Sequence, residues 1–122
     1  MAWLNSEYAP QELWLAGFSF GSYIALRAHE LLQATRLVLI APPMERFDFS
    51  ELYLSKTPTI VVQGAKDEVV SADAVYQWVS AQMNMPNFIW MPEAGHFFHG
   101  QLNELRELIK AAWTADDSNL HV

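Results

Sequence analysis

The chain has 122 residues, which is the size of one domain (residues 1–122), and its 52% hydrophobic content is typical of a packed core and excludes disorder outside the ends. The net charge of −7, with 7 scattered basic residues, argues against a nucleic-acid partner, and the lack of cysteine excludes disulfides and thiol catalysis. The sequence contains neither an apolar run of transmembrane length nor a signal-peptide pattern, so we expect a cytoplasmic protein without membrane contact.

The first half of the chain alternates between strand and helix patterns. The run from Leu13 to Ala16 is apolar at every position, which predicts a strand covered on both faces. Small and apolar residues at helical spacing then predict a helix from Phe20 to about Gln33. Arg36 to Ala41 predicts a second buried strand, which Pro42 and Pro43 end because proline cannot continue the hydrogen-bond ladder.

The second half continues the alternation after a polar and aromatic connection. Thr59 to Gln63 predicts a third strand, and Ser71 is a suitable N-cap for a helix that ends near Met83. Phe88 to Met91 predicts a fourth strand, Gln101 to Trp113 an amphipathic helix, and residues 116–122 a frayed tail. This order favours an α/β fold of about four parallel strands with flanking helices and with its site at the carboxyl ends of the strands.

Residues 17–21, Gly-Phe-Ser-Phe-Gly, lie between the first strand and the first helix and are typical of a nucleophile elbow. We expect both glycines to be required, because a sharp strand-to-helix turn leaves no room for side chains two residues before and after its apex. Ser19 is the apex and the candidate nucleophile. The backbone N–H of Phe20, at the start of the helix, is a candidate oxyanion-hole donor.

Two further residues follow strands in the same way, Asp67 after the third and His96 after the fourth. A serine nucleophile needs a base to take its proton, and the imidazole needs a carboxylate on its other nitrogen. Three loops at one edge of a parallel sheet can bring these groups together. The sequence therefore predicts a triad of Ser19, Asp67 and His96.

Each of these residues has an alternative interpretation: the motif around Ser19 could be a tight turn whose serine has no chemical role, and His96 could be a structural loop histidine. Asp67 is also a suitable turn residue, and Glu93, His96 and His99 have a spacing that a metal site could use, although no further ligand stands at a recognisable position. His29, near the end of the first helix, is interpreted as a solvated or helix-terminal histidine. Four phenylalanines flank the predicted site and either wall an acyl pocket or simply pack: Phe18, Phe20, Phe97 and Phe98.

Four stretches together resemble the α/β-hydrolase superfamily, in particular its small, lidless bacterial members related to dienelactone hydrolases and carboxylesterases. They are residues 15–23, 41–43, 61–70 and 95–100. The third stretch contains Gln63, Gly64 and Asp67, and the fourth reads Gly-His-Phe-Phe-His-Gly. The resemblance implies Ser19 as nucleophile, Asp67 as acid and His96 as base, with His99 outside the triad. Phe18 and Phe97 would contact the substrate. No cofactor or metal is implied.

The chain departs from that family at its N-terminal side. Relatives carry several further strands and a second oxyanion donor before the nucleophile strand, and this sequence corresponds to the C-terminal half only, a truncated α/β-hydrolase fold. The strand from Leu13 to Ala16 then becomes an apolar edge, which invites pairing with another chain. We therefore expect a homodimer or larger assembly joined near this strand.

Two functions of different classes follow from these features. The first is a serine esterase that cleaves small carboxylic esters or thioesters through an acyl-enzyme on Ser19; peptidase or lyase chemistry on the same residues would depend on the shape of the acyl pocket. The alternative is a catalytically weak fragment or pseudoenzyme that acts as a binding or assembly module through the exposed edge.

Overall fold

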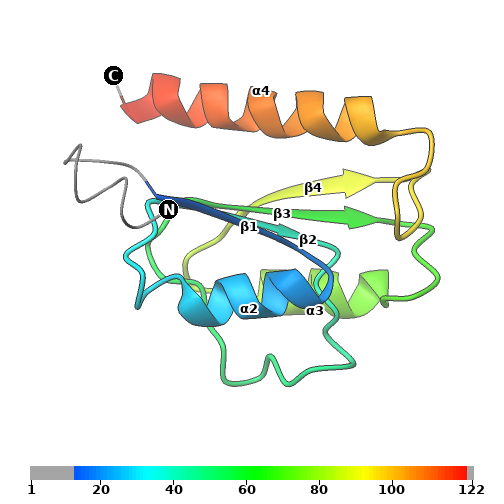
Figure 1. Cartoon of the computed structure of the whole chain (residues 1–122), viewed down its shortest axis with the longest axis horizontal. Coiled ribbons are helices and arrows are strands. Elements are labelled where there is room, and N and C mark those ends of the chain that lie inside the picture. The colour runs from blue at the N-terminus through cyan, green and yellow to red at the C-terminus, as the bar shows by residue number, and fades with distance from the viewer. Residues whose placement is uncertain (1–12, 121–122) are drawn as a thin grey trace.

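The computed structural model describes residues 13–120, which form one four-stranded sheet covered by helices (Figure 1). The strands are β1 (Trp14–Phe18), β2 (Arg36–Ile40), β3 (Thr59–Gly64) and β4 (Asn87–Met91). They lie in the order β1-β2-β3-β4, and each neighbouring pair is parallel. The predicted α/β class, with four parallel strands and flanking helices, is confirmed. The assignment of residues 1–122 to a single domain stays a prediction.

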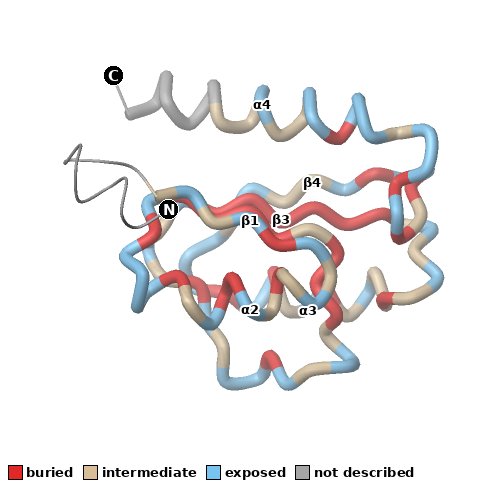
Figure 2. The backbone as a smooth tube through the Cα atoms, viewed as in Figure 1, coloured by how far each residue is buried: buried red, intermediate tan, exposed pale blue. Residues whose placement is uncertain are grey.

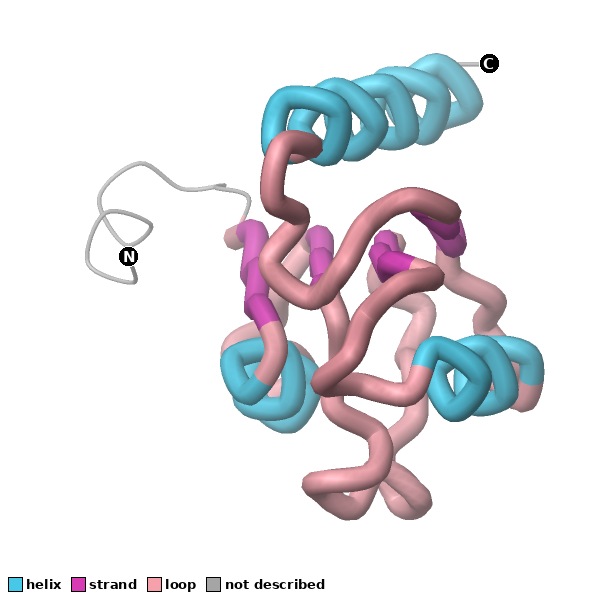
Figure 3. The backbone as a smooth tube through the Cα atoms, turned by 90° about the vertical axis from the view of Figure 1, so that its right-hand side faces the viewer, coloured by secondary structure: helices cyan, strands magenta, loops and turns pink. Residues whose placement is uncertain are grey.

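Three helices form layers on the two faces of the sheet. Helices α2 (Phe20–Ala28) and α3 (Ala72–Ser80) cover one face, and α4 (Leu102–Leu120) lies along the other (Figure 3). Ser71 caps α3 as predicted, because its hydroxyl accepts a hydrogen bond from the Ala74 N–H at 3.2 Å. None of the helices in the described part of the chain is long and apolar enough to cross a membrane. The cytoplasmic location stays a prediction.

The core consists of two apolar clusters separated by the sheet. One lies between the sheet and the α2–α3 layer and includes Leu37, Leu39 and Val61, whereas the other faces α4 and includes Val38, Ile60 and Val62. Alternate residues of the same strand point to opposite faces, so these apolar runs fill both clusters at once. Figure 2 shows the resulting burial along β2 and β3, the two central strands.

Strand β1 is an edge strand, which agrees with the apolar edge expected from the resemblance and corrects the expectation, drawn from the apolar run alone, that its residues are covered on both faces. Trp14, Ala16 and Phe18 are exposed, while the side chain of Leu15 packs against the α2–α3 cluster. Within residues 13–120, only β2 pairs with β1. The strand is apolar throughout, but a parallel neighbour on its outer side is not part of the described chain.

Helix α2 ends at Ala28, five residues earlier than Gln33, and the chain leaves the helix through a turn. Gln33 has a left-handed φ of 56°, and the Ala34 N–H closes the turn on the His29 carbonyl at 2.9 Å. Helical spacing from Phe20 onward would place Leu32 on the same face as the buried Ala25, but Leu32 is exposed. His29 is only 2% exposed instead of solvated. Its Nε2 lies 2.9 Å from Ser55 Oγ, a partner 26 residues away that periodicity does not reveal.

Helix α4 continues to Leu120, which corrects the expectation of a frayed tail over residues 116–120; residues 121–122 of that expected tail lie outside the described residues. Its first turn follows Gly100, and its C-terminal part contains neither proline nor glycine. Without such a residue, no local signal ends the hydrogen-bond ladder near the predicted boundary.

Candidate active site

Ser19 occupies the turn between β1 and α2 in a strained backbone conformation. Its φ of 54° and ψ of −119° lie outside the regions that a side chain normally permits, and it is the N-cap residue of α2. The Ser19 N–H is bonded to the Ile40 carbonyl at 2.8 Å, and the Ser22 hydroxyl donates to the Ser19 carbonyl at 2.6 Å. The strained turn is therefore held by both the neighbouring strand and the helix.

Of the two glycines that flank Ser19, only Gly17 occupies a position where a side chain would not fit. A Cβ on Gly17 would lie 2.1 Å from the Gly21 carbonyl oxygen. Because this oxygen belongs to the backbone, the clash could be relieved only by a shift of the chain. A Cβ on Gly21 would meet no described atom within 4 Å, so the expectation that this position also excludes a side chain is wrong for the described residues. The Gly21 carbonyl lies against Gly17, whereas a Cβ on Gly21 would point into open space.

Asp67 lies in the loop after β3, with its carboxylate fully buried and both oxygens occupied. Oδ1 accepts the N–H groups of Val69 at 2.8 Å and Val70 at 2.7 Å, and Oδ2 accepts Gln63 Nε2 at 3.1 Å and His96 Nδ1 at 2.8 Å. Burial acts to raise the pKa of Asp67, but these four hydrogen bonds outweigh it and hold the pKa below its ordinary value of 3.8. The carboxylate is thus stabilised in its charged form.

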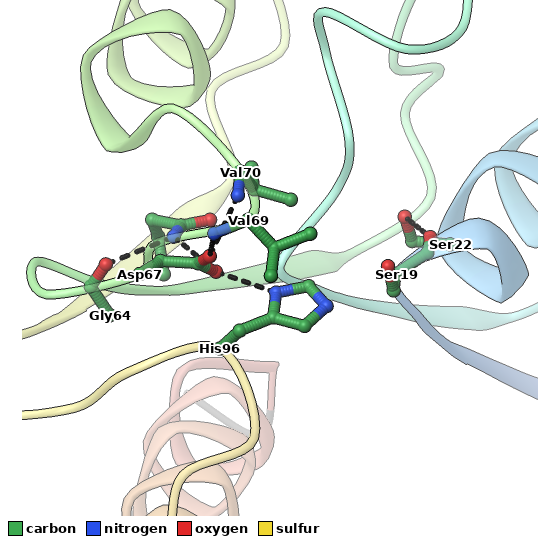
Figure 4. A network of polar contacts seen from close by, with 8 residues as sticks. Ser19, Ser22, Gly64, Asp67, Val69, Val70 and His96 are labelled. Carbon is green, nitrogen blue, oxygen red and sulfur yellow. Dashed lines mark hydrogen bonds and ion pairs between the residues drawn. The ribbon is translucent and has the colours of Figure 1, made fainter.

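His96 comes from the loop between β4 and α4, which reaches back over the sheet toward β1. The His96 ring centroid lies 5.1 Å from that of Phe18, so this loop brings the imidazole beside the end of β1 although β4 is the opposite edge strand. Asp67 holds Nδ1, which assigns the proton to that nitrogen and leaves Nε2 as the acceptor. Figure 4 shows this second nitrogen on the side of the ring that faces Ser19.

The structure therefore joins Asp67 and His96, with Ser19 on the opposite side of the imidazole ring (Figure 4). Within residues 13–120, Asp67 and His96 are hydrogen bonded, but Ser19 and His96 are not. A hydrogen bond between a nucleophile and its base is often formed only in the complex with substrate, so its absence does not exclude the pair. Phe20 is the first residue of α2, so its N–H has no acceptor within the helix and is free to bind an oxyanion.

Aromatic rings surround the candidate nucleophile and base. Phe18 and Phe97 are both exposed, and their centroids lie 5.9 Å apart beside the His96 ring. Phe20 lies on another side, with its ring 4.9 Å from that of Phe47. For Phe98 the packing alternative holds, because it is buried in the cluster under α4. Adjacent residues of this loop thus separate, one toward the site and one into the core.

The alternative metal interpretation finds no matching geometry in the described residues. Glu93 is paired with Lys66, whose Nζ lies 2.5 Å from Glu93 Oε2, and His99 lies beyond the ring of Phe97. Nowhere in the part of the chain that the structure describes do three His, Cys, Asp or Glu residues form a group that could hold a metal ion.

Sequence reasoning missed one polar residue of this site, Gln63. It is the fifth residue of β3, is completely buried, and donates to the Asp67 carboxylate. A signal was present, because a glutamine at the end of an otherwise apolar buried strand must find a hydrogen-bond partner. The sequence does not indicate which partner, since the loop that returns Asp67 to it is set by the tertiary structure.

A four-stranded parallel sheet with a strained serine after one strand and a buried Asp–His pair on two others defines the α/β-hydrolase class of fold. The comparisons with known proteins agree. A lidless α/β serine hydrolase from Xanthomonas campestris is 40% identical, with a TM-score of 0.83 over 90% of this chain and 50% of that one. An α/β serine hydrolase homologue from Coxiella burnetii is 38% identical, with a TM-score of 0.80 over 88% of this chain and 51% of that one.

The chain is also 32% identical to an uncharacterized protein of Rickettsia prowazekii (strain Madrid E), over 98% of this chain and 54% of that protein. It matches no protein-family model. The chain therefore has the fold of the lidless α/β serine hydrolases and corresponds to their C-terminal half, as predicted. It spans about half the length of the relatives that it matches.

Proposed function

We propose that the chain acts as a serine hydrolase on small carboxylic esters or thioesters, with Ser19 as nucleophile, His96 as base and Asp67 as the acid that orients it. The observation that carries this proposal is the buried 2.8 Å contact between Asp67 Oδ2 and His96 Nδ1 on the side of the ring away from Ser19. A carboxylate in this place fixes the tautomer and stabilises the imidazolium that forms during proton transfer.

The reaction would proceed through an acyl-enzyme. Ser19 Oγ attacks the carbonyl carbon while His96 Nε2 takes the hydroxyl proton. The tetrahedral intermediate collapses, the bond to the leaving oxygen or sulfur breaks, and His96 returns the proton to the departing alcohol or thiol. Water then attacks the acyl-Ser19 ester, with His96 again accepting and returning the proton, which releases the carboxylic acid and restores Ser19. No cofactor is needed for these steps.

The oxyanion of the tetrahedral intermediate would be bound by the Phe20 N–H at the start of α2. A second donor has to come from another loop, a water molecule or a partner subunit. One missing donor reduces turnover by about 10²- to 10³-fold where such donors have been removed, so the described residues alone would support slow turnover. Phe18 and Phe97 would contact the acyl group or the leaving group.

Labelling with a fluorophosphonate probe tests the nucleophile directly, with intact mass as the readout. We expect a single adduct on the wild-type chain, none on Ser19→Ala, and strongly reduced labelling of His96→Ala. His99→Ala is the matched control, because His99 belongs to the same loop but lies outside the proposed triad. Loss of labelling in His99→Ala with retention in His96→Ala would reverse the assignment of the base.

A second function has its own observation, the exposed apolar edge. Trp14, Phe18 and Ile24 are 40% to 48% exposed and lie on β1 and the adjacent helix α2. Such an edge is a template for strand pairing. We propose that two copies of the chain associate through β1. If the folded chain does not react with the fluorophosphonate probe, we propose that it serves as a binding or assembly module. A monodisperse monomer at micromolar concentration in analytical ultracentrifugation would contradict the dimer.

A further inference from the structure

We propose that Gln63 is a positioning residue that holds the Asp67 carboxylate in the orientation needed to align His96. The inference rests on the serine hydrolase function proposed above and adds a fourth side chain to its site. Gln63 lies in β3, whose six residues are all buried, and it is itself completely inaccessible. A buried amide lowers the stability of the fold unless its hydrogen-bonding groups find partners. The partners of the Gln63 amide therefore indicate its role.

Both amide hydrogens of Gln63 have an acceptor, and one of the two acceptors is the carboxylate of the site. Nε2 donates to Asp67 Oδ2 at 3.1 Å and to the Gly64 carbonyl at 3.0 Å. Oδ2 is the same oxygen that accepts the His96 Nδ1–H. One carboxylate oxygen is therefore held by two side-chain donors, one from the strand and one from the candidate base.

The orientation of the amide follows from its neighbours. With the amide reversed, Gln63 Oε1 would face Asp67 Oδ2 and the Gly64 carbonyl, which are both acceptors. In the orientation present, Oε1 is buried and has no hydrogen-bond partner among residues 13–120. A buried amide with an unsatisfied oxygen contributes little to the stability of the core. We therefore attribute the role of Gln63 to its Nε2 hydrogen bonds.

The donor side limits how the carboxylate can rotate. Backbone N–H groups of Val69 and Val70 hold Oδ1. Without Gln63, only the His96 side chain would hold Oδ2, and the carboxylate would be less restrained against turning about its Cβ–Cγ bond. His96 would then lose its fixed ring orientation, which lowers the rate of proton transfer and leaves substrate binding unchanged.

The variant that tests this inference is Gln63→Met, which keeps the volume of the side chain and removes the donor. Gln63→His is the rescue variant, because it restores an N–H at a similar reach. Gln82→Met is the matched control, since Gln82 is the other buried glutamine among residues 13–120. Its Oε1 accepts the Leu54 N–H at 2.8 Å and its Nε2 donates to the Trp78 carbonyl at 3.2 Å, so its hydrogen bonds do not involve the site.

Two readouts are measured on all four chains, with thermal unfolding as the check of folding. For Gln63→Met we expect the rate of fluorophosphonate labelling and kcat to fall by about 10- to 100-fold with little change in KM. We also expect the hydrogen-bonded His96 Nδ1 proton signal in NMR to move or broaden. Gln63→His should restore most of both readouts, and Gln82→Met should keep both even if its thermal midpoint falls.

The opposite results would overturn the inference. A folded Gln63→Met chain that retains the labelling rate and the His96 signal would show that the amide has no positioning role. An equal loss in Gln82→Met would show a general effect of core stability. If the wild-type chain is not labelled at all, the proposed hydrolase function fails, and the NMR signal of His96, which needs no activity, still decides the role of Gln63.

Discussion

The Cα of Gly17 lies so close to the backbone of Gly21 that a Cβ added to it would be 2.1 Å from the Gly21 carbonyl oxygen. This contact sets the tight approach of β1 and α2 on which the strained backbone of Ser19 depends. Because the obstructing atoms are backbone, no side-chain movement can relieve the clash. The two glycines of the elbow are therefore not equivalent.

We expect Gly17→Ala to destabilise the chain by about 1–3 kcal/mol or more, because the backbone must shift to admit the new methyl group. Gly21→Ala should be neutral or should stabilise the chain by up to about 1 kcal/mol, because alanine is the better helix former and its Cβ meets open space. Urea unfolding followed by circular dichroism measures both changes. Equal losses in the two variants would mean that a further part of the protein packs against Gly21.

A second prediction concerns acid stability. The pKa of Asp67 is lowered in the folded chain from its ordinary value of 3.8, so the folded state binds this proton less readily than the unfolded state. The stabilisation is fully present above the unfolded pKa and is lost as the pH falls through the lowered folded pKa. Unfolding free energy, measured by urea titration from pH 6 down to pH 2, should therefore decrease in the wild type.

Asp67→Asn should be less stable near neutral pH and should lose less stability over the same acid range, because it has no proton to bind. Asp48→Asn is the control: the pKa of Asp48 is also lowered, by its hydrogen bonds with Ser50, but this carboxylate is exposed to solvent. Its removal should leave the acid profile close to that of the wild type. Parallel profiles for the wild type and Asp67→Asn would contradict a lowered pKa.

The site could be predicted from the sequence to the extent that it depends on local signals. The elbow is a contiguous motif, and the buried strand runs predict a parallel sheet whose carboxyl ends meet, so Ser19, Asp67 and His96 were predicted to lie together from their positions after strands. The structure brings them together on this principle. Their catalytic roles stay a prediction until they are tested chemically.

The features that could not be predicted depend on partners far away in the chain. Burial of His29 follows from its contact with Ser55, and the role of Gln63 follows from the return of the loop that carries Asp67. Phe97 and Phe98 are identical in type and adjacent, yet one is exposed at the site and the other is core, because Phe98 has a left-handed φ of 55° that turns the chain between them. Residue type alone contains no signal for such a turn.

The third prediction concerns acyl-chain selectivity. Phe97 is 54% exposed, and its ring packs at 4.8 Å on that of His96, so an acyl chain on Ser19 would be covered by it. Each methylene buried against an apolar wall contributes about 0.8 kcal/mol, so Phe97→Ala should reduce the preference for butyrate over acetate esters by up to about tenfold. Ratios of kcat/KM for the two p-nitrophenyl esters measure this.

The control for that measurement is Tyr76→Ala, which removes an equally exposed ring that packs on Phe88, on the α3 side of the sheet. It should leave the butyrate-to-acetate ratio unchanged. If Phe97→Ala lowers the hydrolysis of both esters by the same factor, then Phe97 acts through His96 and does not contact the acyl chain.

The last prediction tests association through β1. The Leu13 carbonyl accepts the Thr35 N–H and the Ser19 N–H donates to the Ile40 carbonyl, so the odd-numbered residues of this segment direct their backbone groups toward β2. The backbone groups of Ala16, at the centre of β1, therefore point outward, where a second copy can pair with them. In a symmetric dimer the two β1 strands run antiparallel, and Ala16 lies near its own copy across the two-fold axis.

Ala16→Lys places two like charges at that axis and should convert a dimer into a monomer in sedimentation experiments, while the exposed side chain leaves the fold intact. Met83→Lys is the control, because it adds the same charge at an apolar residue that is 97% exposed and distant from β1. If the dimer survives Ala16→Lys and is disrupted instead by a substitution elsewhere on the surface, the interface lies away from β1. The charge of −7 on each copy opposes association, so added salt should strengthen a dimer held by strand pairing and apolar contact.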